Sequence, residues 1–335
     1  MRAQVLHAFG DDALFSAVEL GDPTAGPGQL LVEIAATSIN PIEVKLRRHG
    51  GEVAPDLPAV LGSDLAGHVV AVGLGVERFA VGDKVFGYIG GVRGSPGAYA
   101  SMAAVDSALL ACVPHSIPLA HAAALPLAGL TALDALERSG VGCGTSLLIL
   151  GATGGVGHLA VQMARALGAV IHAGVRSSDR IGAALELGAD TAFSLDRESP
   201  VDHHSRVTCG AGFDVIIDCT AGIDLGLMMA ALRDGGQLVS LVTRRACDLG
   251  IWSRKGLTLH AIFAPNWLRS ERKREMCGAR LERIARLVDT GQLRPRIDGE
   301  NFILDQLNNA HARFESGHAE GKIIIACAAP DLSTN

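Results

Sequence analysis

A buried strand, a turn rich in glycine and a helix follow one another within residues 146–167, and this succession constrains the fold most strongly. The apolar residues 147–150 have the length and composition of a buried strand, and Gly151 opens the turn. Apolar residues then recur at helical spacing as far as Leu167, before a glycine suited to a helix C-cap. Glycine lets the backbone approach a ligand closely, and the helix N-terminus that follows attracts anions. The segment therefore predicts a turn that binds the pyrophosphate of a dinucleotide.

The cofactor-binding residues expected in this turn are Ala152, Thr153, Gly154, Gly155 and Val156. The plain alternative is an ordinary strand-to-helix turn, which the four glycines within residues 151–157 disfavour. The phosphate-binding loop of nucleoside triphosphatases is excluded, because no Gly-Lys-Ser/Thr sequence follows the turn.

The segment after the next predicted strand indicates which dinucleotide binds. A site for NAD would place an acidic residue at the end of this strand, where it bonds the ribose hydroxyls. Here Arg176-Ser177-Ser178-Asp179-Arg180 follows, and arginine presents a planar set of donors that matches a phosphate. Arg176, Ser177 and Arg180 therefore predict a 2′-phosphate site and NADPH as the cofactor. The alternative is a solvated helix start that is capped by a serine.

The rest of the chain divides into a β-rich part and a part in which strands alternate with helices. Short strands are expected at 30–35, 68–72 and 84–88, separated by glycine-containing pairs typical of turns. From about residue 120 a parallel sheet is expected, with strands at 146–150, 170–175, 214–218, 237–242 and 257–263 and helices near 156–167, 178–187 and 223–233. Helices at 271–290 and 305–316 and a strand at 322–325 are expected to follow.

These elements predict an α/β chain of two domains. The β-rich domain comprises residues 1–119 and is completed by 264–335, and the dinucleotide-binding domain comprises residues 120–263. Neither an internal repeat nor a long linker is evident.

Composition and charge exclude several classes of protein. The 335 residues are 48% hydrophobic and 19% charged, which is typical of a chain with a large core and not of a disordered one. The net charge of −6 argues against a nucleic acid partner. No apolar run reaches the roughly 18 residues of a membrane span, and the N-terminus lacks the apolar stretch of a signal peptide. Because the seven cysteines are scattered, we expect reduced thiols and a cytoplasmic location. Because no apolar run is long enough to span a membrane, we expect no membrane partner.

Several short motifs lie in a specific order along nearly the whole chain. They are Asn40-Pro41-Ile42-Glu43-Val44-Lys45, Leu61-Gly62-Ser63-Asp64-Leu65-Ala66-Gly67, Val81-Gly82-Asp83-Lys84-Val85, Gly97-Ala98-Tyr99-Ala100, Leu130-Thr131-Ala132, the glycine turn, Leu187-Gly188-Ala189-Asp190 and Gly321-Lys322-Ile323. With these motifs the chain resembles the medium-chain dehydrogenase/reductase superfamily, and specifically its zinc-free quinone oxidoreductase branch. The resemblance implies a GroES-like β-rich catalytic domain built from both ends of the chain and a Rossmann domain, a doubly wound parallel sheet, between them. It also implies an active site in the cleft where the domains meet.

The positions that bind zinc in the alcohol dehydrogenases of this superfamily hold other residues here. Those enzymes carry a catalytic cysteine, a Gly-His-Glu segment and a second cysteine, and the corresponding places are Asn40, Gly62-Ser63-Asp64 and approximately Ala128. Serine and alanine cannot supply the thiolate and imidazole ligands that zinc prefers. The adjacent histidines His203 and His204 lie in a polar stretch and are expected at the surface. No metal site is predicted.

The resemblance implies reduction of enones, alkenals or quinones with a hydride from NADPH. The protein would then supply orientation, a donor to the carbonyl oxygen and a proton source. In relatives the segment with Asn40 and Lys45 faces the cleft, so both are the expected catalytic residues. Asn40 would donate to the oxygen or to the nicotinamide ribose, and Lys45 would donate to the oxygen or relay a proton. The alternatives are a turn residue before a proline for Asn40 and a solvated charge for Lys45.

Further site residues follow from the family pattern alone. Tyr88 and Phe263 are expected to line the substrate pocket. Contacts with the cofactor are expected from Thr131, Thr220, Val242, Phe263, Ala264 and Lys322. For Lys322 the alternative is a protective charge on an edge strand. Some quinone reductases carry a tyrosine near the position of Lys45, and its absence here favours enones over quinones.

Two other functions stay open, together with the oligomeric state. An enoyl-thioester reductase would need a path for a phosphopantetheine arm, and a redox-inactive NADPH-binding scaffold protein would keep the glycine turn without turnover. The strand at 257–263 would form the open edge of the Rossmann sheet. In relatives this edge pairs with its twin, so we expect a homodimer.

Overall fold

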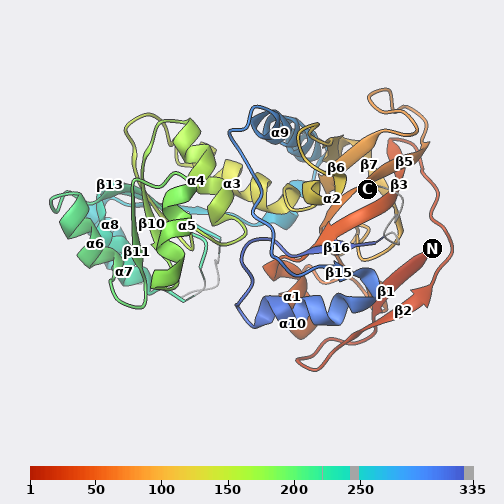
Figure 1. Cartoon of the computed structure of the whole chain (residues 1–335), viewed down its shortest axis with the longest axis horizontal. Coiled ribbons are helices and arrows are strands. Elements are labelled where there is room, and N and C mark those ends of the chain that lie inside the picture. Colours follow the sequence, from red (N-terminus) through yellow and green to blue (C-terminus); the bar gives the residue numbers. More distant parts are fainter. Residues whose placement is uncertain (221, 242–248, 328–335) are drawn as a thin grey trace. The chain divides into compact units, whose positions relative to one another are not determined.

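The computed structural model describes residues 1–220, 222–241 and 249–327, and the chain falls into two compact units (Figure 1). The first unit joins Met1–Leu130 to Ala264–Asn335, and the second is Thr131–Phe263. The first change of unit therefore comes after Leu130 and not after residue 119. The reason is that α2 (Leu119–Ala122) contacts two strands of the first unit, β3 and β5.

The first unit is rich in strands, as its turn-forming glycine pairs predict. Its strands are β1 (Arg2–Leu6), β2 (Phe15–Glu19), β3 (Gln29–Ser38), β4 (Ala59–Val60), β5 (Asp64–Val72), β6 (Lys84–Tyr88), β7 (Met102–Asp106), β8 (Leu110–Cys112), β15 (Phe302–Ile303) and β16 (Ile324–Ala326). Its helices are α1 (Pro41–His49), η1 (Ser107–Leu109), α2, the start of α3 (Pro126–Arg138), η3 (Ala264–Leu268), α9 (Glu271–Asp289), η4 (Leu304–Gln306) and α10 (Leu307–Glu315). The larger sheet has the strand order β15-β16-β3-β5-β6-β8, with β7 also paired to β3.

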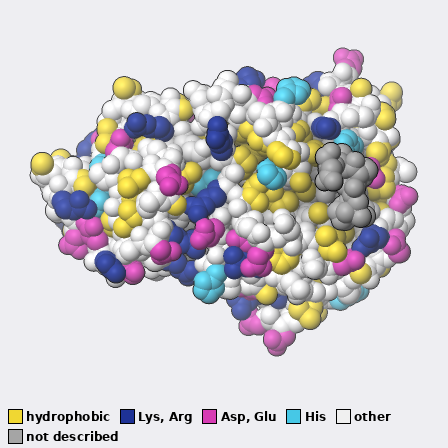
Figure 2. Space-filling model, viewed as in Figure 1, with side chains coloured by type: hydrophobic (Ala, Val, Ile, Leu, Met, Phe, Trp, Pro, Cys, Tyr) yellow, Lys and Arg dark blue, Asp and Glu magenta, His cyan; other side chains and the backbone are white. Residues whose placement is uncertain are grey.

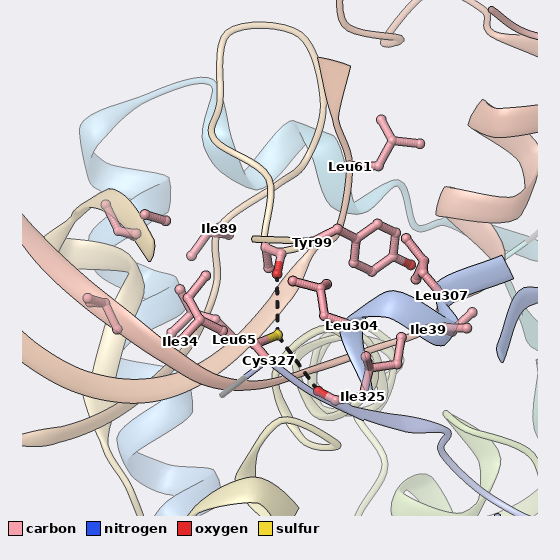
Figure 3. Packing of buried hydrophobic residues seen from close by; sticks show 14 of the residues in the cluster. Ile34, Ile39, Leu61, Leu65, Ile89, Tyr99, Leu304, Leu307, Ile325 and Cys327 are labelled. Carbon is pink, nitrogen blue, oxygen red and sulfur yellow. Dashed lines mark hydrogen bonds between the residues drawn. The ribbon is translucent and has the colours of Figure 1, made fainter. Parts of the chain in front are cut away.

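The core of the first unit is built from strands that are distant in sequence. Along β3, Leu30, Val32 and Ile34 are buried and Glu33 is exposed, which is the alternation expected of a strand with one face in the core. Figure 3 shows Ile34 and Leu65 packed with residues of the C-terminal segment such as Ile325. The antiparallel pairing of β16 with β3 therefore brings the last part of the chain next to the residues before α1.

The second unit is a parallel sheet with helices between its strands. Its strands are β9 (Ser146–Leu150), β10 (Val170–Val175), β11 (Thr191–Ser194), β12 (Phe213–Asp218), β13 (Leu232–Ser240) and β14 (Thr258–Ala261). Its helices are the rest of α3, α4 (Gly157–Ala166), η2 (Ser178–Arg180), α5 (Ile181–Glu186), α6 (Pro200–Val207), α7 (Leu225–Ala231) and α8 (Leu249–Lys255). The strand order β11-β10-β9-β12-β13-β14 corresponds to 3-2-1-4-5-6 in the order of the chain. This is the Rossmann order, so the expected fold class is confirmed.

The expected boundaries agree with the structure for β6, β9 and β10, each of which is buried from its second residue to its last. β9 and β10 have the bounds that the sequence predicts, whereas β13 begins earlier, at Leu232, which pairs with Phe213. The expectation that both adjacent histidines lie at the surface is wrong for His203. This side chain is fully buried on α6, and its ring stacks on Phe193 with centroids 4.1 Å apart.

Charges of both signs are interspersed on the surface (Figure 2). On the face shown in Figure 2, Lys and Arg side chains stand beside Asp and Glu side chains. Exposed ion pairs such as Arg2 with Asp305 and Arg165 with Asp190 have this character. Within the described residues, no helix combines the length and the apolarity needed to span a membrane.

Candidate functional site

The glycine turn of the second unit joins β9 to α4 and is held by backbone hydrogen bonds. Gly151 has φ 75°, in the left-handed region that favours glycine. Its N–H donates to Gly174 O at 2.8 Å, and the N–H of Gly154 donates to Gly151 O at 2.9 Å. Helix α4 then begins at Gly157. The N–H groups of His158 and Leu159 donate to Gly154 O and Val156 O, whereas those of residues 155–157 make no hydrogen bond among the described residues. The turn therefore offers backbone donors to an anion.

A side chain at Gly157 would collide with the turn itself. A Cβ atom there would lie 2.1 Å from Gly151 O and 2.8 Å from the Cα atom of Ala152. Gly157 thus permits the close contact of helix and strand that a dinucleotide site requires. Ala152 and Thr153 are buried, whereas residues 154–156 are partly exposed and are the accessible part of the turn.

The residues expected to hold a 2′-phosphate lie directly after β10. Arg176 is exposed, and Ser177 and Arg180 are half-buried around η2. Asp179 lies beside them, and its pKa is below the ordinary value because it is hydrogen-bonded to the Ser177 side chain and because Arg180 is close. The segment therefore presents two cations that suit a phosphate and one carboxylate that suits ribose hydroxyls.

Thr220 lies next to the glycine turn, and the other expected contacts of the second unit are more scattered. The backbone N–H and the hydroxyl of Thr220 donate to Asp218 Oδ1 at 2.8 and 2.7 Å. If Gly151 carried a Cβ atom, this atom would lie 3.1 Å from Thr220 Cγ2. Thr131 is buried at the start of the unit, and Phe263 is 39% exposed at its end. Val242 lies outside the described residues, and Ala264 opens η3 of the first unit.

A buried polar cluster lies at the start of α1 in the first unit, and we call Asn40, Glu43, Asp64 and Lys322 the Asn40 cluster. None of the four side chains is more than 3% exposed. Helix α1 begins after Asn40 because Pro41 suits the first helical position and because Glu43 Oε2 accepts the N–H of Asn40 at 2.7 Å. The helix start thus fixes the backbone of Asn40.

Asp64, at the head of β5, is the central acceptor of the Asn40 cluster. Its Oδ2 atom accepts from Ser38 Oγ at 2.7 Å and from Asn40 Nδ2 at 2.8 Å, and its Oδ1 atom accepts from the N–H of Leu127 at 2.7 Å. Lys322 Nζ lies 3.4 Å from Asp64 Oδ2 and forms an ion pair with it. The buried carboxylate is therefore both hydrogen-bonded and balanced in charge, as burial requires.

Lys322 is brought to Asn40 by the returning C-terminal segment. Its Nζ atom donates to Ile39 O at 3.1 Å and to Asn40 Oδ1. Strand β16, which follows Lys322, lies between β15 and β3, and the N–H of Lys322 donates to Arg296 O at 2.8 Å. The alternative of a protective charge on an edge strand is therefore wrong, because this segment is bonded on both sides and the side chain is 3% exposed.

The carboxyl group of Glu43 has an unusual protonation equilibrium. The pKa of Glu43 is raised to about 7, chiefly by burial and also by the charge of Asp64, while Ser63 and Lys322 act in the opposite direction. The N–H of Ser63 donates to Glu43 Oε1 at 2.9 Å. Both oxygens of Glu43 therefore accept backbone N–H groups, of Asn40 and of Ser63, so the side chain links α1 to the segment before β5.

Lys45 and Tyr88 have different surroundings from Asn40. Lys45 lies on the exposed side of α1, and the described residues give it no hydrogen bond or ion pair. Tyr88 is fully buried at the end of β6, with its ring edge-on to Trp267 at a centroid distance of 5.9 Å. Its hydroxyl finds no hydrogen-bond partner among the described residues, and burial raises the pKa of Tyr88 well above its ordinary value.

Sequence reasoning missed Glu43 and Asp64 as members of the site. Both acids stand within the motifs that carry the resemblance, and both had a recognisable signal. Glu43 is an acid at the third position of a helix that begins with Asn-Pro. Asp64 is a charge at the head of the apolar run Leu65-Ala66. An acid that opens a buried strand needs a partner, but its identity depends on the tertiary fold.

Two family models match the chain. Residues 26–115 match the alcohol dehydrogenase GroES-like domain, and residues 187–325 match the zinc-binding dehydrogenase family. The first match covers much of the β-rich unit, and the second runs from the Rossmann sheet into the C-terminal segment.

Several proteins are similar to this chain over nearly its whole length. The chloroplast envelope quinone oxidoreductase homolog of Arabidopsis thaliana is 30% identical over 97% of this chain and 99% of its own length. The chloroplastic NADPH-dependent alkenal/one oxidoreductase of the same organism is 30% identical over 97% of this chain and 79% of its own length. The crystal structure of an alcohol dehydrogenase superfamily protein from Novosphingobium aromaticivorans is 36% identical, with a TM-score of 0.92 over 98% of this chain and all of that one.

The name of one matching family implies zinc, but the Asn40 cluster has the wrong donors for it. The resemblance places Asn40 and the Ser63-Asp64 pair at the positions of the zinc ligands, and Asp64 Oδ2 already accepts from an amide and a hydroxyl. The ammonium of Lys322 is bonded to Ile39 O and Asn40 Oδ1, so a positive charge already lies among these oxygens. Among the described residues there is no group of three or more His, Cys, Asp or Glu side chains that suits a metal ion. The Asn40 cluster therefore does not fit zinc.

Proposed function

Because the chain belongs to the medium-chain dehydrogenase/reductase superfamily, in its quinone oxidoreductase-like branch, we propose that it reduces α,β-unsaturated carbonyls and quinones with NADPH. When bound, NADPH supplies a hydride, which the β-carbon of an enone accepts. The C=C bond becomes a single bond, a proton from the site or from water joins the α-carbon, and NADP⁺ leaves. The observation that carries the proposal is the Asn40 cluster, which offers an amide donor where a zinc enzyme holds its metal.

Asn40 acts on the carbonyl oxygen of the substrate. As hydride arrives at the β-carbon, negative charge develops on this oxygen, and a buried N–H donor stabilises it more strongly than water does. The residue is 3% exposed, its backbone is fixed by Glu43, and its amide is held by Asp64. Such a donor needs no reorganisation when the charge appears, and this chain therefore works without a metal.

NADPH is the proposed cofactor in place of NADH. Arg176, Ser177 and Arg180, which follow β10, would hold the 2′-phosphate, and the turn at 154–156 would hold the pyrophosphate. The printed name of the alkenal/one oxidoreductase relative also includes NADPH. Asp179 favours NADH instead, and the two arginines outweigh its single charge.

Steady-state reduction of a substrate panel tests the proposed function. Purified protein and NADPH are combined with cyclic enones, 2-alkenals, quinones and enoyl thioesters, and oxidation of NADPH is followed at 340 nm. We expect the enones and alkenals to give the highest kcat/KM, with quinones slower. A preference for the thioesters would indicate an enoyl-thioester reductase. NADPH binding without turnover of any substrate would indicate a redox-inactive scaffold protein.

Coenzyme preference is tested with a matched pair of variants. Arg176→Met with Arg180→Met removes both cations of the proposed phosphate site, and we expect kcat/KM for NADPH to fall about 10- to 100-fold while that for NADH changes little. Arg272→Met, on the exposed side of α9, is the control for loss of an arginine elsewhere. A wild-type preference for NADH would contradict the assignment of NADPH.

We further propose a homodimer formed through β14 and a cytoplasmic location. Strand β14 pairs only with β13 in the described sheet, and Thr258, Leu259 and Ala261 are exposed. An uncharged edge strand of this kind pairs readily with its symmetry mate. Light scattering is expected to give about twice the chain mass of 34.7 kDa, and a monomer would contradict the proposal.

A further inference from the structure

The Asn40 amide lies between a carboxylate and an ammonium, and this arrangement fixes its orientation. Nδ2 donates to Asp64 Oδ2 at 2.8 Å, and Oδ1 accepts from Lys322 Nζ. Turning the amide by 180° would set its NH₂ group against the ammonium and its oxygen against the carboxylate. Because both contacts would be repulsive, the two charges select one orientation of the amide.

One donor of this amide remains for a ligand. An asparagine NH₂ group carries two N–H bonds, and one of them is used for Asp64. The other takes part in no hydrogen bond among the described residues. An ammonium bonded to the amide oxygen also draws electron density from the nitrogen, which makes the remaining N–H a stronger donor.

The ammonium of Lys322 lies closer to Ile39 O and the Asn40 amide than to the Asp64 carboxylate. Lys322 Nζ lies 3.4 Å from Asp64 Oδ2, which is long for a charged hydrogen bond, and its contacts with Ile39 O and Asn40 Oδ1 are closer. A lysine placed only to neutralise Asp64 would lie nearer to that carboxylate. The ammonium of Lys322 also donates to Asn40 Oδ1, on the side chain proposed to act on the substrate.

We propose that Lys322, supported by Asp64, is the positioning residue of this active site. It locks the Asn40 amide in the orientation that presents one Nδ2–H to the carbonyl oxygen of the substrate, and it strengthens that donor. The inference rests on the proposed function, because that function identifies the acceptor. It gives Lys322 a role through Asn40 and not through direct contact with the cofactor.

A double-mutant cycle on the rate tests whether Lys322 acts through Asn40. Lys322→Met keeps the length of the side chain and removes its charge, and we expect kcat to fall about 30-fold with KM for the enone changed less than about 3-fold. In the Asn40→Ala background the same substitution is expected to change kcat less than about 2-fold, because the amide that it orients is gone. An equal loss in both backgrounds would overturn the proposal.

A second variant separates positioning from folding. Lys322→Met alone leaves Asp64 buried without its counter-charge, which destabilises a protein. The pair Lys322→Met with Asp64→Asn removes both charges, and we expect its melting temperature to return toward the wild-type value while kcat stays low. Wild-type kcat in this neutral pair would overturn the proposal. Lys273→Met, exposed on α9, is the matched lysine control.

A spectroscopic measurement tests the amide without relying on turnover. The chain has only six asparagines, so selective ¹⁵N labelling gives few side-chain amide signals, and Asn40→Ala identifies the pair from Asn40. We expect Lys322→Met to shift this pair and to speed its exchange with water, and unchanged signals would overturn the proposal. If wild-type protein reduces no enone or quinone, the proposed function fails, and these signals still decide whether Lys322 locks the amide.

Discussion

The glycine turn of the second unit and the Asn40 cluster of the first are built in opposite ways. The turn consists of residues 151–157, and its donors belong to the backbone. The Asn40 cluster consists of side chains, and the hydrogen bond from Lys322 to Asn40 spans 282 positions of the chain. A backbone site depends on the space around a few glycines, whereas a side-chain site depends on balanced charges. Substitutions in the Asn40 cluster should therefore lower stability most, whereas substitutions in the glycine turn should lower cofactor affinity most.

The largest expected effect comes from breaking the charge balance of the Asn40 cluster. Asp64→Ala leaves Lys322 buried without a counter-charge, and we expect it to lower the free energy of unfolding by about 3–5 kcal/mol. Urea denaturation measures this loss. Asp305→Ala, which removes an exposed partner of Arg2, is the control and should cost less than about 1 kcal/mol. Equal losses of stability in the two variants would show that burial does not make the Asp64–Lys322 pair more costly to break.

Crowding the glycine turn should affect binding more than stability. Gly157→Ala would place a Cβ atom only 2.1 Å from Gly151 O, so the turn must move. We expect NADPH affinity, measured by quenching of protein fluorescence, to fall about 10- to 100-fold, which corresponds to about 1.4–2.8 kcal/mol. Gly182→Ala on α5, where a Cβ atom meets open space, should leave the affinity unchanged. Wild-type affinity in the first variant would contradict the assignment of the turn.

One buried titratable group in each unit should make the free energy of unfolding depend on pH, and the two groups should act in opposite directions. Burial lowers the pKa of His172 in β10 to about 4, so its contribution to stability is lost as pH falls below about 6.5. Burial raises the pKa of Glu43 to about 7, so its contribution is present below pH 4.5 and is lost as pH rises through 7. Relative to wild type, His172→Gln should therefore gain stability as pH falls, and Glu43→Gln should gain stability as pH rises.

Urea denaturation at pH 5 and pH 8 measures both pH trends. The absolute cost of each substitution cancels when the two pH values are compared for one variant. Parallel trends in the His172 and Glu43 variants would contradict the opposite roles of the two buried groups.

The smallest expected effect concerns the hydroxyl of Tyr88. This group is buried without a hydrogen-bond partner among the described residues, so Tyr88→Phe removes an unsatisfied polar atom. We expect the melting temperature to stay the same or to rise by a few degrees, with kcat/KM changed less than about 3-fold. A larger loss of kcat/KM with an unchanged melting temperature would assign the hydroxyl to the substrate pocket.

Contiguous features of the sequence predicted the structure well. The bounds of β9 and β10 and the turn between β9 and α4 follow from local apolar runs and from glycines, whose conformations depend on near neighbours. His203 was misplaced because it lies in a polar stretch, and only the packing of α6 on the sheet buries it. Asn40 was predicted as a site residue from the resemblance, and no local pattern connects it with Asp64 and Lys322.

The sequence by itself determined the two-part fold, the superfamily and the dinucleotide turn of this protein, because each depends on residues that are neighbours in the chain or on motifs in a fixed order. The tertiary structure decided how the Asn40 cluster is assembled. The pairing of β16 with β3 carries Lys322 to Asn40, and burial makes Asp64 its obligatory partner. Burial then turns three unremarkable polar residues into one coupled unit, since charges far from water must be satisfied by one another.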